Sequence, residues 1–329
     1  MILSRTPCRM SFVGGGTDIP AFYRRHGGAV VSTSIRSYVN VLVNPKFDGG
    51  VRVSYSRTEL CEKSSEVEHP IVREALCMLG IASGIEIVSI ADVPSSGTGL
   101  GSSSSFTVGL LNALHAFKSE RAAKEQLGHE SCKLEIDILG EPIGKQDQFA
   151  AAFGGLNFIR FNEDDTVDVE PLNCIYQVEN QIESHILTFY TGIGRRARDI
   201  LKAQNAVIED GSRTSVLKRM AAQAEELRGE LRRGNVDALG EALHEGWRLK
   251  QSITPEISSS QIGDWYNRAR AAGAAGGKLL GAGAGGFLVF YANPDRHEAI
   301  RRELAELRPV KLRLDREGSQ VIFADSGFK

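Results

Sequence analysis

The chain has 329 residues, of which 41 are acidic and 39 basic, so its net charge is close to zero and indicates neither a nucleic-acid nor a membrane partner. No apolar run approaches the ~20 residues of a membrane span, and the N-terminus lacks the apolar core of a signal peptide. The five cysteines form no C-x-x-C pair, which argues against a zinc site or a disulfide framework. We therefore expect a cytoplasmic protein of about two domains.

The first 55 residues are expected to form strands around a glycine-rich loop. Residues 5–13, 29–33 and 37–43 alternate or run apolar, as strands do. The loop after the first of these consists of Gly14, Gly15, Gly16, Thr17 and Asp18. It is either a loose turn or a backbone that approaches a ligand closely, with Asp18 accepting a hydrogen bond from a hydroxyl group.

A second glycine-rich loop lies between a predicted strand, residues 84–90, and a predicted apolar helix, residues 106–117. It reads Pro94, Ser95, Ser96, Gly97, Thr98, Gly99, Leu100, Gly101, Ser102, Ser103, Ser104, Ser105. A strand, a glycine loop and a helix start together offer free N–H groups and the positive end of the helix dipole to a phosphate group. No G-x-x-x-x-G-K-[ST] sequence occurs, so serine side chains would have to contact the phosphates that a lysine contacts in a P-loop. The alternative is a flexible Gly/Ser linker.

Two carboxylates in residues 120–155 have both a structural and a functional interpretation. Residues 124–138 predict a helix, residues 139–142 end it, and residues 144–155 begin a second helix. Asp147 falls in the first turn of the second helix, where a carboxylate commonly compensates the dipole. Glu135 lies on the first helix, where an acidic residue is commonly solvated. Sequence patterns alone do not decide between these interpretations.

Near residue 183 the pattern changes, which divides the chain into residues 1–182 and 183–329. Residues 156–185 look like strands and a turn. After them come predicted strands at 186–190, 287–291 and 321–324 and predicted helices at 198–233, 236–249, 260–272 and 294–307. This order indicates an α+β second domain.

Residues 281–286 match the pattern G-x-G-x-x-G, which alone would suggest a dinucleotide site. That site needs a strand before the glycines and a helix after them. Here the strand follows the glycines, so we reject a dinucleotide-binding fold.

The three glycine-rich stretches, 6–18, 94–105 and 278–287, resemble in this order the three motifs of the GHMP kinases. Within that superfamily the chain is most similar to the D-glycero-D-manno-heptose 7-phosphate kinases, through Gly-Gly-Gly-Thr-Asp and residues 144–150 and 244–250. Galactokinases have a Glu-His pair where this chain has Gly15 and Gly16, which argues against galactose. The fucose-type kinases are the next most similar branch and provide the main alternative assignment.

The resemblance implies an α+β fold with an N-terminal domain like domain 2 of ribosomal protein S5, a ferredoxin-like C-terminal domain, and ATP and acceptor between them. It assigns catalysis to Asp147 and Arg9, and the metal site for Mg²⁺ to Ser103 and Glu135. The turn before Asp147 is one residue longer than in mevalonate kinases, so Asp137 competes with Glu135. ATP would be bound by Pro94, Ser96, Gly97, Thr98, Gly99, Leu100, Gly101, Ser102, Ser103 and Ser104. The substrate would be bound by Gly14, Gly15, Gly16, Thr17, Asp18, Lys145, Gly283, Ala284 and Gly285.

The activity implied by the resemblance is ATP-dependent phosphorylation of the anomeric hydroxyl of D-glycero-D-manno-heptose 7-phosphate. The 1,7-bisphosphate would lead to nucleotide-activated heptose for a surface polysaccharide, and the enzyme could be a homodimer. Candidates for the 7-phosphate site are Arg24, Arg25, Lys145, Arg195, Arg196 and Lys278. The alternatives are a fucokinase- or galactokinase-type enzyme for an unphosphorylated sugar, a decarboxylase of the same fold, and a non-catalytic sugar-binding protein.

Overall fold

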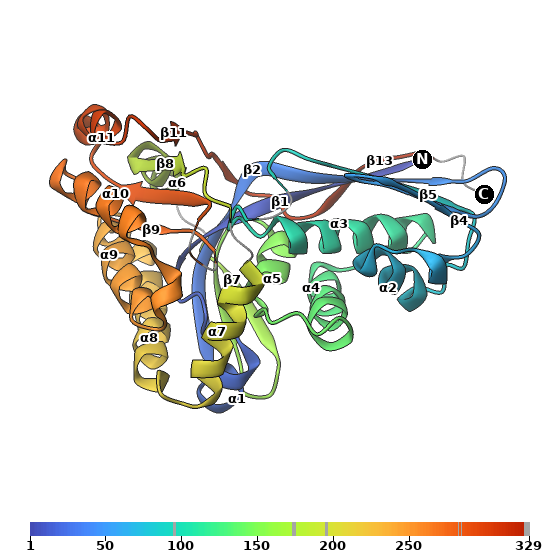
Figure 1. Cartoon of the computed structure of the whole chain (residues 1–329), viewed down its shortest axis with the longest axis horizontal. Coiled ribbons are helices and arrows are strands. Elements are labelled where there is room, and N and C mark those ends of the chain that lie inside the picture. The colour runs from blue at the N-terminus through green and yellow to red at the C-terminus, as the bar shows by residue number, and fades with distance from the viewer. Residues whose placement is uncertain (95–96, 173–175, 195–196, 282, 284, 326–329) are drawn as a thin grey trace.

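The computed structural model describes residues 1–94, 97–172, 176–194, 197–281, 283 and 285–325, and within them it forms two sheets (Figure 1). The large sheet has the strand order β13-β1-β2-β5-β3-β4, with β12 and β6 also paired with β2, and β7 with β6. Its strands are β1 (Ile2–Val13), β2 (Gly28–Pro45), β3 (Val51–Ser54), β4 (Thr58–Cys61), β5 (Ile85–Ala91), β6 (Leu156–Phe161), β7 (Val167–Pro171), β12 (Leu314–Asp315) and β13 (Gln320–Ala324). The small sheet has the order β11-β8-β10-β9. Its strands are β8 (Ile186–Tyr190), β9 (Gly276–Leu279), β10 (Phe287–Tyr291) and β11 (Arg308–Pro309).

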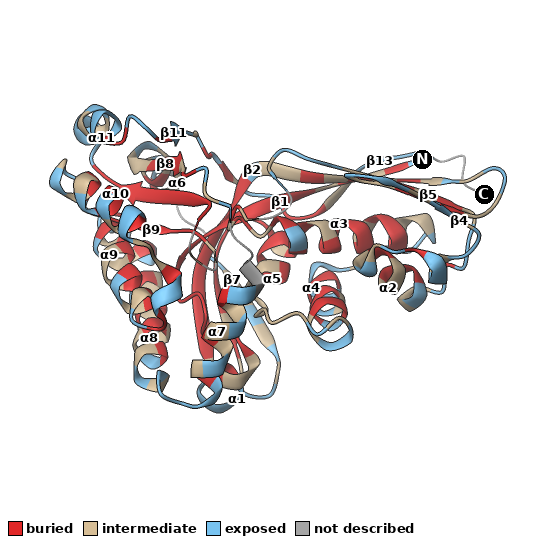
Figure 2. Cartoon of the chain, in the orientation of Figure 1, coloured by how far each residue is buried: buried red, intermediate tan, exposed pale blue. Residues whose placement is uncertain are grey.

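Helices cover one face of the outer half of the large sheet, where α3 packs against β1 and β2 (Figure 1). The helices of this part are α2 (Pro70–Met78), α3 (Ser102–Phe117), α4 (Lys124–Cys132) and α5 (Gln146–Phe153), with a π-helical turn at Lys133–Ile138. Helix α1 (Pro20–His26) lies apart from them and packs against helices of the second group, described next. The second half of β2 alternates between buried and more exposed residues, as expected for a strand with one packed and one open face (Figure 2). Its first half, from Gly28 to Ile35, is buried throughout.

The small sheet packs against a second group of helices, in which α9 lies along β9. These helices are α6 (Tyr176–His185), α7 (Ala197–Glu209), α8 (Thr214–Arg232), α9 (Ala238–Gln251), α10 (Ser260–Ala271) and α11 (His297–Glu303). Helix α8 contacts β2 and α9 contacts β1, so the two parts share a continuous boundary. None of the helices in the described ranges is long and apolar enough to cross a membrane.

The helix predicted over residues 198–233 is divided into α7 and α8, and two larger features also differ from the sequence-based expectation. Residues 176–185 are helical, not extended, because Val178 and Ile182 are four residues apart and both are buried on the same helix face. Strands β12 and β13 belong to the large sheet, although the division at residue 183 assigned them to the second domain. Strand β13 pairs antiparallel with β1 from Ile2↔Ala324 to Arg5↔Gln320, a partnership that no local pattern reveals.

Candidate active site

A cleft of about 750 Å³ brings together residues from the three glycine-rich stretches. It is lined by β1, the loop before α3, the first turns of α3 and α5, the π-helical turn, the last turn of α9 and β9. The ionisable side chains among the lining residues include Arg9, Asp18, Glu135, Asp147, Lys250 and Lys278. Elements of both helix groups thus contribute charged groups to one cleft.

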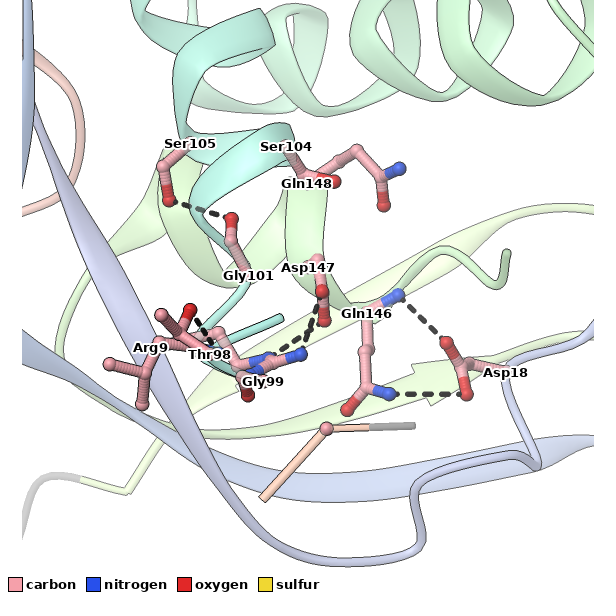
Figure 3. A network of polar contacts seen from close by, with 12 residues as sticks. Arg9, Asp18, Thr98, Gly99, Gly101, Ser104, Ser105, Gln146, Asp147 and Gln148 are labelled. Carbon is pink, nitrogen blue, oxygen red and sulfur yellow. Dashed lines mark hydrogen bonds and ion pairs between the residues drawn. The ribbon is translucent and has the colours of Figure 1, made fainter. Parts of the chain in front are cut away.

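Arg9 and Asp147 form a bidentate ion pair in this cleft (Figure 3). Arg9 Nε donates to Asp147 Oδ1 and Arg9 Nη2 donates to Asp147 Oδ2, both at 2.7 Å. Strand β1 fixes Arg9 further, since its backbone N–H donates to the carbonyl of Leu100 at 2.9 Å and Nη1 donates to the carbonyl of Gly99. Charge-assisted pairs of this geometry orient both partners strongly. The carboxylate of Asp147 is therefore held in one orientation at the start of α5.

The loop before α3 adopts its shape through alternating glycines. Gly97, Gly99 and Gly101 have φ angles of 74°, 74° and 72°, a left-handed conformation that favours glycine. At Gly101 a Cβ atom would also lie 3.1 Å from Asp147 Oδ2. The loop therefore delivers the free N–H groups of α3 close to the ion pair, as a phosphate site requires.

The serines at the start of α3 face different surroundings. Ser103 is exposed and lines the cleft, whereas Ser104 is buried and donates to Glu135 Oε2 at 2.8 Å. Of the residues predicted to bind ATP, those lining the cleft are Gly97, Thr98, Gly99, Gly101, Ser102, Ser103 and Ser104. Leu100 is in the core, Pro94 is exposed outside the lining, and Ser96 lies outside the described residues.

Glu135 lies on the π-helical turn and is buried against α3 and α5. Its oxygens accept from Ser104 Oγ, from Thr107 Oγ1 at 3.0 Å and from Gln148 Nε2 at 2.6 Å. Burial raises the pKa of Glu135 to about 7 despite these bonds. Asp137 is exposed and outside the cleft lining, so between the two carboxylates the geometry favours Glu135. A π-helical turn holds one residue more than an α-helical turn, which fits the longer connection to Asp147.

The donor set fits a magnesium ion that arrives with nucleotide phosphates. Ser103 and Glu135 both line the cleft, and Mg²⁺ typically takes one or two carboxylates together with phosphate oxygens and water. Within the described ranges no cluster of three or more His, Cys, Asp or Glu residues could form a cage of protein ligands alone.

Asp18 is buried where the first glycine loop meets the start of α5 (Figure 3). Its Oδ1 accepts from the N–H of Gly16 at 2.9 Å and its Oδ2 from the N–H of Gln146 at 3.1 Å. A Cβ atom on Gly144 would lie 2.0 Å from Asp18 Oδ2, which explains the glycine there. Burial raises the pKa of the Asp18 carboxyl. Asp18 lines the cleft and can accept one further hydrogen bond from a ligand.

Several residues predicted to bind substrate lie outside the cleft lining and make close contacts with neighbouring backbone. Gly15 and Gly16 line the cleft, but Gly14 packs against Ala29, and Thr17 Oγ1 both donates to and accepts from the backbone of Ala29. Gly283 and Gly285 pack closely against the backbone of Ile257 and Ile193, and Ala284 lies outside the described residues.

Of the basic candidates for an acceptor phosphate, Lys278 alone among those described lines the cleft. Lys145 Nζ donates to Asp165 Oδ1 at 3.1 Å and lies over the ring of Tyr23. Arg24 pairs with the same Asp165, and Arg25 is exposed. Arg195 and Arg196 are not among the residues described.

The prediction missed two kinds of cleft residue. The first is Lys250, which lines the cleft and is buried. Its sequence context is a charged helical stretch, in which a lysine is expected to be solvated. Only the similarity of residues 244–250 to the heptose 7-phosphate kinases drew attention to this stretch. The side-chain oxygens Ser11 Oγ, Gln146 Oε1 and Gln204 Oε1 are buried without a partner in the described chain. Because buried polar atoms are rarely unpaired, these three lining residues indicate a polar ligand.

A helix start that could bind an anion, an Arg–Asp pair beside it, and hard-oxygen groups that could hold a metal with nucleotide phosphates are the components expected of a phosphoryl-transfer enzyme. Family models agree: residues 56–155 match the GHMP kinases N terminal domain and residues 227–309 the GHMP kinases C terminal domain, together more than half of the chain. The chain belongs to the GHMP kinases, and it is an ATP-dependent phosphotransferase with the two-domain fold of that family. The family and the fold class predicted from the sequence are confirmed.

Individual relatives cover most of the chain. The D-glycero-alpha-D-manno-heptose 7-phosphate kinase of Campylobacter jejuni is 28% identical over 92% of this chain and 94% of its own length. The bifunctional fucokinase/GDP-fucose pyrophosphorylase of Arabidopsis thaliana is 26% identical over 91% of this chain but only 31% of its own length. The crystal structure of a D-glycero-D-manno-heptose 1-phosphate kinase from Bacteroides thetaiotaomicron superimposes with a TM-score of 0.81 at 23% identity, covering 99% of this chain and 100% of that one. Galactokinase of Lactococcus lactis, complexed with galactose, gives a TM-score of 0.76 at 17% identity, with 98% and 95% covered.

Proposed function

We propose that this kinase transfers the γ-phosphoryl group of ATP to the anomeric hydroxyl of D-glycero-D-manno-heptose 7-phosphate. The observation that carries the substrate is the similarity to the heptose 7-phosphate kinase of Campylobacter jejuni along nearly the whole length of both chains. The product would be the 1,7-bisphosphate, a precursor of nucleotide-activated heptose.

In the reaction, the bond between the γ-phosphorus and the β–γ bridging oxygen breaks, and a bond from phosphorus to the acceptor oxygen forms. ADP leaves, and the hydroxyl proton passes to Asp147. Arg9 occupies one lone-pair position on each Asp147 oxygen, so the other positions are open to the acceptor hydroxyl. The glycine loop and the start of α3 bind the nucleotide phosphates. Mg²⁺, held by Ser103 and Glu135, would neutralise charge on those phosphates.

Asp18, Gln146 and Ser11 would bind the sugar hydroxyls. Asp18 has spare acceptor capacity, and Gln146 and Ser11 carry buried oxygen atoms without partners. Gly15 leaves room beside them, since a Cβ atom there would lie 3.5 Å from Gln146 Nε2. A Cβ atom on Gly16 would lie 2.7 Å from Gln204 Nε2. The expected cytoplasmic location and homodimer stay predictions.

A kinase of an unphosphorylated sugar such as fucose is the second candidate, favoured by the similarity of 91% of the chain to the plant fucokinase. A panel of acceptors in an ADP-release assay separates the two. We expect heptose 7-phosphate to exceed unphosphorylated heptose, mannose, fucose and galactose by at least ~10² in kcat/KM, because buried cations left without a phosphate are costly. Mannose 6-phosphate should fall between. If fucose or galactose is the best acceptor, the heptose assignment is wrong and the kinase assignment stands.

A further inference from the structure

Two buried lysines in the cleft have no role in the phosphoryl-transfer step described above. Lys250 is on the last turn of α9 and Lys278 is on β9; their exposed fractions are 7% and 6%. Lys250 Nζ donates to the carbonyl of Gly281 at 2.9 Å, and Lys278 Nζ donates to the carbonyl of Phe12 at 3.1 Å. An ammonium group has three N–H donors, so these contacts account for one donor on each lysine.

Neither lysine has an acidic partner among the described residues within ion-pair distance. Elsewhere the buried or half-buried cations of this region are paired, Arg9 with Asp147 and Lys145 with Asp165. Burial lowers the pKa of Lys250 to about 8, with Asp18 and Asp147 opposing and Arg9 reinforcing the effect. Burial also lowers the pKa of Lys278, and the charge of Lys250 is the next cause. Two buried amino groups thus lie near one another in a place where an unpaired charge is costly, so a bound anion would favour the charged form of both.

Lys250 and Lys278 lie close to the regions expected to bind the nucleotide and the acceptor. The Gly281 carbonyl that holds Lys250 belongs to the loop that touches the nucleotide loop, since a Cβ atom on Gly281 would lie 2.3 Å from Gly99 Cα. Asp18 and Asp147, which would contact the acceptor, are close enough to affect the charge of Lys250. Lys278 lines the same cleft. Its Nζ contacts the carbonyl of Phe12 on β1, which is three residues after Arg9.

We propose that Lys250 and Lys278 together form a phosphate-binding site in the cleft, completed by a dianionic group of a substrate. Two ammonium groups without acidic partners match a phosphate dianion in charge and offer it several donors. The phosphate has two possible sources, the ester phosphate of the acceptor and the phosphoryl group in transfer from ATP. The inference rests on the kinase activity and does not depend on the acceptor being a heptose.

The first experiment measures phosphate binding without turnover. The full chain, saturated with MgADP to fill the nucleotide loop, is titrated with inorganic phosphate while the melting temperature is followed. We expect the melting temperature of the wild type to rise with phosphate concentration, as mass action requires. Lys250→Met and Lys278→Met should lose this response. Lys124→Met is the matched control, because Lys124 Nζ also donates to a backbone carbonyl, of Phe153, but is outside the cleft.

The second experiment identifies the source of the phosphate. If the pair binds the acceptor's phosphate, the Met variants should raise KM for the sugar phosphate at least ~10-fold and leave the unphosphorylated sugar unaffected. If it binds the transferring phosphoryl group, kcat should fall by the same factor with both acceptors. The sugar used is whichever the acceptor panel selects, with its phosphate ester, so failure of the heptose assignment does not affect this test.

A stability measurement separates binding from a structural role. Replacing a buried unpaired cation by methionine should leave the melting temperature without phosphate unchanged or higher. A structural lysine would instead destabilise the protein while each folded molecule keeps its kinetics. Lys250→Gln and Lys278→Gln, which retain a donor for the carbonyls, provide a second pair of variants. The proposal is overturned if folded variants keep the wild-type phosphate response, kcat and KM.

Discussion

Gly99 of the nucleotide loop and Gly281 of the third motif lie back to back, with no room for a side chain between them. A Cβ atom on Gly99 would lie 2.3 Å from the carbonyl oxygen of Leu280, and one on Gly281 would lie 2.3 Å from Gly99 Cα. Both residues have left-handed φ angles, 74° and 77°. The glycines at 281–286 therefore resemble a dinucleotide motif only in sequence; one of their functions is to let two loops of different domains touch.

This contact predicts a large effect of a single methyl group. Gly281→Ala should destabilise the protein by more than the ~1–2 kcal/mol of left-handed strain alone. The added Cβ atom would clash with the backbone of Gly99, which cannot change rotamer as a side chain can. Gly49→Ala is the matched control, with a φ of 75° and open space around the position. Urea unfolding of both variants measures the difference. An equal loss of unfolding free energy in Gly281→Ala and Gly49→Ala would show that the two loops separate easily.

The ion pair with Arg9 predicts a kinetic effect of Asp147→Asn. This substitution keeps the shape of the side chain and removes its charge, so turnover should fall by roughly 10²–10⁴ if Asp147 accepts the proton. The affinity for ATP, measured by calorimetry, should change little because the nucleotide phosphates bind to the loop and α3. Turnover close to the wild type would mean that Asp147 only stabilises the start of its helix.

Metal dependence provides a third prediction. Glu135→Gln and Ser103→Ala should each raise the Mg²⁺ concentration needed for half-maximal activity, because each removes one hard oxygen ligand. Asp137→Asn is the control from the same turn, since Asp137 is exposed and outside the cleft. A Mg²⁺ shift with Asp137→Asn but not with Glu135→Gln would move the metal to the other carboxylate.

The lowered pKa of Lys250 predicts a pH dependence of phosphate binding. Lys250 is faced by Asp18, Asp147, Arg9 and Lys278, and its pKa in the folded protein is about 8. As the pH rises through 8 the ammonium loses its proton, so the phosphate response of the MgADP complex should weaken. Titration of inorganic phosphate between pH 6.5 and 9.5 measures this. Lys124→Met, whose lysine lies outside the cleft, should show the same weakening near pH 8, and a wild-type response that stays constant across this range would assign phosphate binding to other groups.

The same shift has an opposite effect on stability. The unfolded chain keeps the Lys250 proton up to its ordinary pKa near ~10.4, whereas the folded chain releases it near 8. Between these values the unfolded state binds more protons, so Lys250 makes stability rise with pH, by at most ~1.4 kcal/mol per unit. Denaturation of the wild type and of Lys250→Met at pH 7, 8, 9 and 10 should show a difference that shrinks as the pH increases.

The sequence predicted local features well and distant ones poorly. Strand β10 begins and ends where its apolar run indicated, at Phe287 and Tyr291, and α3 begins at Ser102, inside the serine run. The pairing of β13 with β1 could not be predicted, because its partners lie at opposite ends of the chain. Lys250 was missed for a similar reason. Its burial arises from β9 and the Gly281 loop, which no helical pattern contains.

The pairing of β13 with β1 has a consequence for how the protein is made. On the ribosome β1 is synthesised before both helix groups, and the strand that covers its outer edge, β13, only after them. Until then the strand that carries Arg9 has an open edge, which is a site for mispairing with other nascent chains. We therefore expect residues 1–182, expressed alone, to aggregate, and residues 320–324 supplied as a separate peptide to reduce that aggregation. Light scattering with the peptide and with a scrambled peptide measures the effect.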